Sequence, residues 1–429
     1  MVRAWSYAAI AALTANVAMG YDAVKCSTGS KCPSSLPCCS QYGECGVGAY
    51  CLGGCDPLSS NTLDSCVPAP VCKSDDYKLT SLDGITDKTK YLGDATKSNW
   101  VVDGTPLAYQ DQVLLTMAPK TVGTVMASSH YVWYGSISAT MKTSRGAGVV
   151  SAFILLSDVK DEIDYEFVGV DLESAQTNYY FQGITNYNNG GNISVTDTFN
   201  NYHTYTIDWT PDQITWSIDG KVGRTKKKSD TWNSTANRYD YPQTPARIQL
   251  SIWPGGLASN AAGTISWAGG PIDWSGPDIK SNGYYYATVN EVKVQCYDAP
   301  GNVTKSGSTS YIYADSSGME GAVQITDKGT VLKSLLGTGV NMTADLPTSS
   351  ASNSEIANIP GLNGGGPGLF GGYQPDGSSG ANPTKNANPT AFNQGSSGSK
   401  SGAIKPEGER ILKGSLFAGL IAVVGTMIL

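Results

Sequence analysis

Three carboxylates recur at every second position within the stretch Asp161–Phe167. If this stretch is a β-strand, Glu162, Asp164 and Glu166 share one face, because side chains on a strand alternate with a period of two. The opposite face is then apolar and aromatic. Crowded carboxyls repel one another, and their pKa values separate, so one group stays protonated while another is ionised. Such a pair is the requirement for cleaving a glycosidic bond.

The same heptapeptide fits two other structures when it is taken alone. It could be a solvated acidic strand face, or an amphipathic helix with Ile163, Phe167 and Val170 at helical spacing. For a retaining mechanism, two carboxyls must come within about 5–5.5 Å of each other, whereas Cα atoms four residues apart on a strand are roughly 13 Å apart. Two long glutamates can lean together over a sugar, with Asp164 between them.

Composition limits the function classes. The chain has 429 residues, 29 basic and 36 acidic, so its net charge of −7 argues against nucleic-acid binding. Its histidines are His130 and His203 alone, which disfavours a histidine-based metal site, and we expect neither metal nor cofactor. Nine of its ten cysteines lie between Cys26 and Cys72, behind an apolar start, which indicates disulfides in an oxidising compartment.

Strand patterns dominate residues 57–300. Tyr131–Met141 alternates, Val149–Leu156 is a continuous apolar run, and turns rich in Gly, Asn and Pro separate the segments. We therefore predict an all-β antiparallel sandwich. In the strand Arg247–Trp253, Arg247, Gln249, Ser251 and Trp253 share a polar face, as a sugar cleft needs, although an ordinary outward face with one surface Trp would look the same.

The two ends of the chain carry targeting signals. Residues 1–20 read as a secretory signal peptide. Residues 301–400 are rich in Ser, Gly, Asn, Thr and Pro and predict a flexible stalk. Residues 401–429 place small residues, a polar spacer and an apolar tail in the order of a glycosylphosphatidylinositol (GPI) signal that is removed, with Ser401 as the predicted attachment residue. A tail-anchored helix is the alternative.

The predicted N-glycosylation sequons are Asn192, Asn233, Asn302 and Asn341.

Residues 21–56 hold seven cysteines and too few apolar residues for a core, so disulfides must hold this module together. Spacing leaves their pairing open. The run Cys38–Cys45 followed by Tyr50-Cys51 resembles the hevein-like chitin-binding module. The resemblance implies that Tyr42 and Tyr50 stack on N-acetylglucosamine rings and that Ser40 hydrogen-bonds an acetamido group. Glu44 departs from that family's pattern, which often has an aromatic residue there.

Cys66, Cys72 and Cys296 lie outside this cluster, and a bridge from Cys66 or Cys72 to Cys296 would join the ends of the next domain.

The acidic strand resembles the active-site strand of glycoside hydrolase family 16. Flanking segments sharpen the match: Gly148–Leu156, His203–Pro211, Ile214–Gly220, Trp253–Gly256 and Gly263–Trp274. Together they resemble the Crh family of fungal cell-wall transglycosylases, in the branch with a chitin-binding module and a GPI signal. The resemblance implies a jelly-roll, concanavalin-like sandwich.

In that family's terms, Glu162 is the nucleophile, Glu166 the general acid/base and Asp164 the helper between them. Trp253 and Thr264 resemble donor-subsite residues. Arg247 and Gln249 share the face of Trp253, Trp216 is a candidate aromatic platform, and His203 either binds sugar or only satisfies a neighbouring strand.

The implied reaction cleaves chitin with retention and transfers it to β-1,3- or β-1,6-glucan, at the cell surface or in the wall. The expected partners are these polysaccharides, with a membrane contact through the GPI anchor only, no nucleic acid, and a monomeric chain. Hydrolysis without transfer, a non-catalytic wall lectin and a structural mannoprotein are the alternatives.

Overall fold

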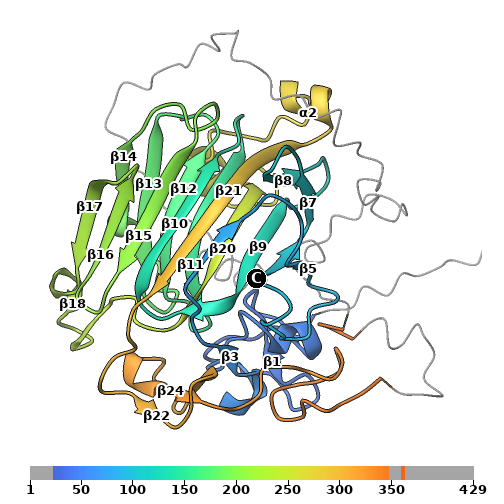
Figure 1. The fold of residues 1–429 in the computed structure, drawn as a ribbon, viewed down its shortest axis with the longest axis vertical. Helices are drawn as coiled ribbons and strands as arrows, with labels where there is room; N and C mark the ends of the chain where they lie inside the picture. Colours follow the sequence, from blue (N-terminus) through green and yellow to red (C-terminus); the bar gives the residue numbers. More distant parts are fainter. Residues whose placement is uncertain (1–22, 347–358, 363–429) are drawn as a thin grey trace, which may run out of the picture.

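Two sheets packed face to face form the body of the protein, in a computed structural model that describes residues 23–346 and 359–362 (Figure 1). Their strand pairs are antiparallel except for one parallel pair at an edge. The acidic strand is β12 (Glu162–Val168), as predicted, and it lies third in an eight-stranded sheet, here called the cleft sheet. In spatial order the cleft sheet contains β14 (Gly191–Ser194), β13 (Ser174–Tyr180), β12, β11 (Val149–Ser157), β20 (Ala246–Pro254), β9 (Thr124–Val132), β6 (Trp100–Asp103) and β5 (Ile85–Asp87).

The second sheet, here called the outer sheet, covers the apolar face of the cleft sheet. Its strands are β17 (Lys221–Lys227), β16 (Gln213–Ile218), β15 (His203–Trp209), β10 (Gly135–Lys142), β21 (Tyr285–Cys296), β8 (Val113–Met117) and β7 (Thr105–Ala108), with β4 (Asp75–Lys78) paired to β21. The prediction of an all-β antiparallel sandwich is confirmed.

Helices are few and short in the described residues. They are α1 (Ala262–Trp267), α2 (Pro277–Asn282) and the 3-10 turns η1 (Gly48–Cys51), η2 (Leu63–Ser65), η3 (Tyr187–Asn189), η4 (Lys228–Thr231) and η5 (Glu320–Ala322). None of these helices has the length and apolar character needed to cross a bilayer.

The core lies between the two sheets and follows the period of two. Ile163, Tyr165 and Phe167 of β12 are buried in it, and Tyr165 and Phe167 contact Tyr205 of the outer sheet with ring centroids 5.4 and 4.7 Å apart. The run Tyr131–Met141, by contrast, is not one strand. It leaves the cleft sheet at the end of β9 and enters the outer sheet at β10, turning where Tyr134 takes a positive φ of 62°.

Four disulfides hold the N-terminal module, whose ladder pairs β1 (Cys38–Cys39) with β2 (Cys45–Gly46). Three bridges each span 13 residues, and a fourth extends the module past the predicted boundary at residue 56. The four are Cys26–Cys39, Cys32–Cys45, Cys38–Cys51 and Cys55–Cys66.

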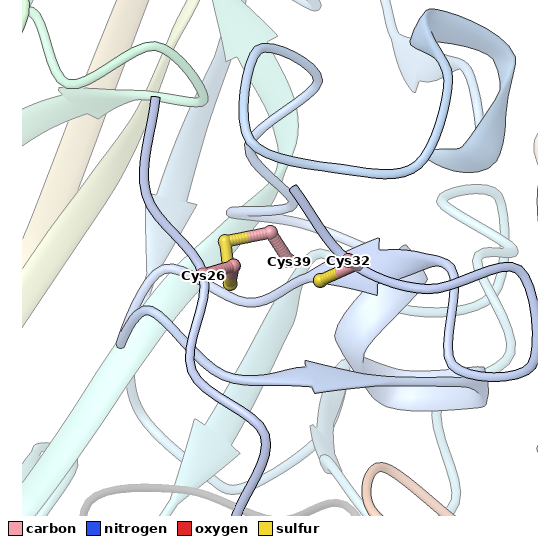
Figure 2. Close-up of side chains that lie close together, drawn as sticks. All are labelled: Cys26, Cys32 and Cys39. Atoms are coloured by element: carbon pink, nitrogen blue, oxygen red, sulfur yellow. A yellow bond between two sulfur atoms is a disulfide. The ribbon is translucent and has the colours of Figure 1, made fainter. Parts of the chain in front are cut away.

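Cys26, Cys32 and Cys39 bring their sulfur atoms within 4.8 Å of one another, as a metal site would (Figure 2). All three are disulfide-bonded, so none offers the thiolate that a metal ion needs.

The bridge Cys72–Cys296 spans 224 residues and joins the two ends of the sandwich, as the sequence suggested. Closing so long a loop removes much of the conformational entropy of the unfolded chain.

Residues 301–346 are folded, so the predicted stalk does not begin at residue 301. They form β22 (Thr304–Lys305), β23 (Ser310–Tyr313) and β24 (Val323–Thr326), which make a four-stranded sheet with β3 (Ala69–Pro70) through the pairing of β23 with β3. The chain then runs along the module, where Leu332 enters the module's apolar cluster and Gly339 donates its N–H to the Ser65 carbonyl (2.8 Å). Figure 1 shows the module in dark blue and this segment in orange together at one end of the sandwich. A third small sheet pairs β18 (Trp232–Asn233) with β19 (Arg238–Tyr239).

A network of buried polar contacts joins the module to the sandwich. The Gly54 N–H donates to Tyr131 Oη and to Asp158 Oδ1, both at 3.0 Å, and Tyr131 Oη–H donates to the same Asp158 oxygen at 2.8 Å. Lys160 and Asp56 form an ion pair at 3.2 Å. Burial raises the pKa of Asp158 to about 7, against the lowering effects of Tyr131, Arg247 and Gly54.

We predict that Leu332→Ala lowers the melting temperature by about 5–10 °C, because removing a buried Leu side chain costs about 2–5 kcal/mol. The neighbouring exposed Val331 supplies the control, since Val331→Ala removes no buried contact. Thermal unfolding followed by circular dichroism measures both. Equal melting temperatures for wild type and Leu332→Ala would mean that residues 301–346 do not belong to the folded unit.

We also predict that Asp158 makes stability fall as pH rises. Between the unfolded pKa near 4 and the folded pKa of about 7, the native state binds the proton that the unfolded chain has lost, so the native state weakens across that window. Asp158→Asn keeps an oxygen acceptor for Gly54 and removes the titration. The melting temperature of wild type should therefore drop more between pH 4.5 and pH 7.5 than that of the variant. Parallel curves would contradict the assignment.

Candidate active site

Glu162, Asp164 and Glu166 all face the open side of the cleft sheet, away from the core, and all three are buried. This is the arrangement that the period of two predicts. Their neighbours on β13 carry polar side chains: Glu162 pairs with Tyr180, Asp164 with Asn178 and Glu166 with Gln176. The three carboxyls therefore stand in a row on a polar face.

The outer sheet fixes the backbone of β12 from the opposite side. Trp216 Nε1 donates to the carbonyl oxygen of Asp164 at 3.0 Å, and Tyr165 Oη donates to the carbonyl of Ser217 at 2.9 Å. Both donors are buried aromatic side chains, whose rigid rings leave little freedom for the strand to shift. The middle of the carboxyl row is thus held from beneath.

Burial raises the pKa of Glu162 above the ordinary range of a glutamate, and a hydrogen bond with the Asp164 side chain opposes the rise. Desolvation disfavours the charged carboxylate, while a donor at Asp164 favours it. The protonation of Glu162 therefore depends directly on its neighbour two residues along the strand.

The face that carries the carboxyls continues across four more strands of the cleft sheet. The register joins Asp164 to Ile154, Gln249, Ala127 and Val101, one residue on each successive strand. A second row joins Glu166 to Ala152, Ser251, Val125 and Asp103. Ala152 and Ala127 contribute small side chains to these rows, beside longer polar residues on β12 and β20.

Trp253 closes one side of the cleft together with a residue from α1. Its ring stacks on Trp267 with centroids 5.9 Å apart and an interplanar angle of 26°. Trp267 Nε1 donates to Gln176 Oε1 at 2.8 Å, which ties α1 to the strand beside Glu166. The buried Thr264 lies on the same helix.

Several buried polar atoms along the cleft have no hydrogen-bond partner in the part of the chain that the structure describes. They are Gln249 Oε1, Ser251 Oγ and Thr264 Oγ1. Buried polar groups are almost always paired in folded proteins, so unpaired groups converging on a groove indicate a polar ligand. Arg247, on the same strand face, is engaged through Nε, which donates to the Ser128 carbonyl at 2.8 Å.

The prediction that Trp216 is an aromatic platform for sugar is wrong, and His203 fits the second of its two alternatives. Trp216 is fully buried between the sheets, where Arg224 packs 4.6 Å above its ring, so it offers no surface to a sugar. His203 is in the outer sheet, with Nδ1 2.7 Å from Asp219 Oδ2 and Nε2 3.0 Å from Thr196 Oγ1. His203 therefore connects β15 to the turn after β16 and to the loop after β14.

The residues predicted for the module's sugar-binding face differ in accessibility. Tyr42 is partly exposed, and burial raises its pKa beside Asp103. Tyr50 is 4% exposed and belongs to the module's apolar cluster. Ser40 is buried and accepts the Glu44 N–H at 3.3 Å. Of the three residues, only Tyr42 is more than slightly exposed.

The glycosylation and anchor predictions divide between described and undescribed residues. Asn192, Asn302 and Asn341 are exposed, whereas Asn233 is half-buried, with Nδ2 donating to Asp240 at 2.8 Å. Asn192 stands on edge strand β14, opposite Gln176 and therefore in line with Glu166. Ser401, the signal segment 1–20 and the GPI signal 401–429 lie outside the described residues.

Comparison with known proteins gives the same assignment as the geometry. The family model of glycosyl hydrolases family 16 matches residues 94–269, which include β12, β20 and α1. Crh-like protein 3 of Botryotinia fuckeliana is 61% identical over 319 residues, covering 74% of this chain and 72% of that protein. Crh-like protein 2 of Aspergillus fumigatus is 55% identical over 358 residues, covering 82% of this chain and 81% of that protein. This chain belongs to the Crh-like family.

A solved structure supports the fold of this Crh-like chain. The Crh5 transglycosylase in complex with NAG is 33% identical, with a TM-score of 0.50, and the match covers 60% of this chain and 95% of that one. The protein is therefore an enzyme of glycoside hydrolase family 16, in the glycosidase and transglycosylase class.

Sequence reasoning missed four residues of the Crh-like cleft. Three of them, Gln176, Asn178 and Tyr180, alternate along β13 and face the carboxyl row. The same period-of-two reading that identified β12 would have found them. The fourth, Trp267, is three residues after Thr264, one helical turn along, so the two side chains share a face of α1.

We predict that a carbon-13 NMR titration of the carboxyls shows Glu162 titrating above the usual glutamate pKa near 4.3. Asp164→Ala removes the opposing hydrogen bond and should raise the Glu162 midpoint further. Asp164→Asn, which keeps a donor, is the matched control and should shift it less. A midpoint that is the same in all three proteins would show that Asp164 does not act on Glu162.

Proposed function

We propose that this protein is a retaining transglycosylase that cleaves chitin and transfers the released chain to β-1,3- or β-1,6-glucan, linking the two polymers in the fungal cell wall. The row of three carboxyls on the polar face of β12 is the observation that carries the proposal. The Crh-like relatives and the transglycosylase title of the solved neighbour support it.

In this proposal Glu162 attacks the anomeric carbon of the donor sugar while Glu166 gives its proton to the departing glycosidic oxygen. The products of this step are a covalent glycosyl–Glu162 ester and a shortened chain with a free hydroxyl. Asp164 hydrogen-bonds Glu162 and lowers its pKa, which keeps more of the nucleophile ionised in its buried site. Trp216 holds the Asp164 backbone and so keeps the spacing of the row.

Transfer follows when a glucan hydroxyl takes the place of water. Glu166, now ionised, accepts the proton of that hydroxyl, whose oxygen attacks the anomeric carbon and releases Glu162. Each of the two displacements inverts the anomeric carbon, so the product keeps the anomeric configuration of the donor. Trp253, Thr264, Arg247 and Gln249 are proposed to bind sugar, because they line the groove beside the carboxyls.

The remaining predictions complete the proposal. Residues 1–20 direct secretion and Ser401 receives the GPI anchor, which places the enzyme on the outer membrane face or in the wall. The disulfide module binds chitin through Tyr42, with Ser40 and Tyr50 supporting it, and the sequon asparagines carry glycans. The chain acts as a monomer without cofactor or metal.

We predict that Glu162→Gln and Glu166→Gln each lower turnover by about a thousandfold or more while the melting temperature stays near wild type. The assay combines a chitin oligosaccharide donor with a fluorescent laminarin-type acceptor and sizes the labelled products. Wild type should give labelled products lengthened by N-acetylglucosamine units. Glu173→Gln, at an exposed glutamate outside the cleft row, is the control and should keep full activity.

Two outcomes would contradict the proposal. Shortened chitin without a labelled adduct would identify a hydrolase. If wild type gives no product from either sugar, the protein is a non-catalytic wall lectin.

A further inference from the structure

The module is seated against the cleft sheet and shares a core with it. Leu52 and Tyr50 of the module form one apolar cluster with Tyr91 and Leu332, and Val101 of the cleft sheet packs against this cluster. The Gly54 contacts with Tyr131 and Asp158 add hydrogen bonds to the same junction. Apolar packing and buried polar bonds together fix the module in one position.

A pocket of about 80 Å³ lies at this junction, and both parts of the protein line it. The module contributes Gln41, Tyr42 and Gly53, and the cleft sheet contributes Ala127, Asp103 and Arg247. Gly53 leaves the space for the Arg247 guanidinium, because a Cβ there would lie 2.4 Å from Nη1. Tyr42, the more exposed of the two module tyrosines, therefore lines a pocket that the cleft sheet helps to form.

The cleft-sheet side of this pocket is formed by the last residues of the two rows that begin at Asp164 and Glu166. Ala127 and Val101 stand in the row of Asp164, and Val125 and Asp103 stand in the row of Glu166. With strands about 4.8 Å apart, Ala127 lies roughly 14 Å and Val101 roughly 19 Å from Asp164. The residue rows that begin at Asp164 and Glu166 therefore end in the lining of this pocket.

Polar groups mark the path between them. Gln249 Nε2 donates to Gln41 Oε1 of the module at 3.3 Å, while Gln249 Oε1, which is buried, has no partner among the described residues. Ser251 Oγ, on the next residue of β20 that faces the same side, is also buried and has no hydrogen-bond partner among the described residues. Donors and acceptors beside a flat aromatic ring are what a sugar chain with hydroxyl, acetamido and apolar faces requires.

We propose that the module and the catalytic cleft bind one and the same chitin chain, with the pocket at Tyr42 as a distal donor subsite. This inference rests on the proposed function, since it takes the donor to be chitin. The module then acts as part of the active-site cleft on its β20–β9–β6 side, and its effect depends on donor length. An independent tether would bind a different chain and would leave the kinetics of soluble donors unchanged.

The test measures kcat/KM of the full-length protein for soluble chitin oligosaccharides of increasing length, with one fixed glucan acceptor. Wild type should prefer long donors that span the groove and the pocket. Tyr42→Ala should lower this long-over-short preference about fivefold to tenfold, as expected for the loss of one stacking ring. Tyr239→Ala removes an exposed tyrosine from β19, in a hairpin outside the cleft sheet, and should keep the wild-type preference.

A second variant tests the sheet surface between the carboxyls and the pocket, without changing the module. Ala127→Leu places a larger side chain on the floor between the carboxyls and the pocket, and it should reduce the long-donor preference while binding to insoluble chitin through the module persists. If both variants keep the wild-type preference, the module and the cleft bind separate chains and the inference is overturned. A preference that depends on acceptor length in place of donor length would overturn it as well. Failure of the proposed function is a distinct result, because wild type itself would then form no transfer product.

Discussion

The alternation of side chains along β12 is the constraint on which the rest of the structure depends. One face of this strand contributes Ile163, Tyr165 and Phe167 to the core, and the other carries three buried carboxyls. Burying such groups is costly, because desolvation opposes ionisation and like charges repel. Aromatic packing on the core face of β12 offsets the cost of burying the carboxyls on its other face. The hydrogen bonds of Trp216 and Tyr165 fix the backbone of the strand between these two faces. A change in the register of β12 by one residue would exchange these faces and destroy both core and site.

Strand patterns made the central part of this arrangement predictable from the sequence. The period of two placed the faces of β12 and β20 correctly, because each face assignment needs only one strand. The same rule could not place Trp216 and His203, since it does not say to which sheet a strand belongs. Both residues turned out to be in the outer sheet. Tyr131–Met141 shows the same limit, because its alternation continues unchanged while the chain crosses from one sheet to the other.

Composition misled the interpretation of residues 301–346 for a different physical reason. These residues are rich in Gly, Ser and Thr, as a linker is, yet a few apolar side chains are enough when an existing surface receives them. Tyr311, Val323 and Ile325 add to the main core, and Leu332 adds to the module's cluster. A segment that folds by docking needs little hydrophobic content of its own, so its average composition does not reveal it. The docking position of the module was unpredictable on similar grounds, because cysteine spacing determines neither pairing nor the surface that the module contacts.

Rigidity decides what a second binding surface contributes to an enzyme. A module on a flexible linker raises the local concentration of polymer near the active site, and the linker's length and stiffness set the gain. Here buried hydrogen bonds and apolar packing hold the module against the sandwich, and residues 301–346, which follow the Cys72–Cys296 bridge, pack on the module as well. A surface fixed in this way loses no further freedom when a ligand bridges it and the cleft, which lowers the entropic cost of binding a long chain. The same rigidity excludes chains that cannot follow the straight rows from Asp164 to Val101. Selection for an extended polymer would therefore follow from the geometry of the junction, without any added specificity in the carboxyl row itself.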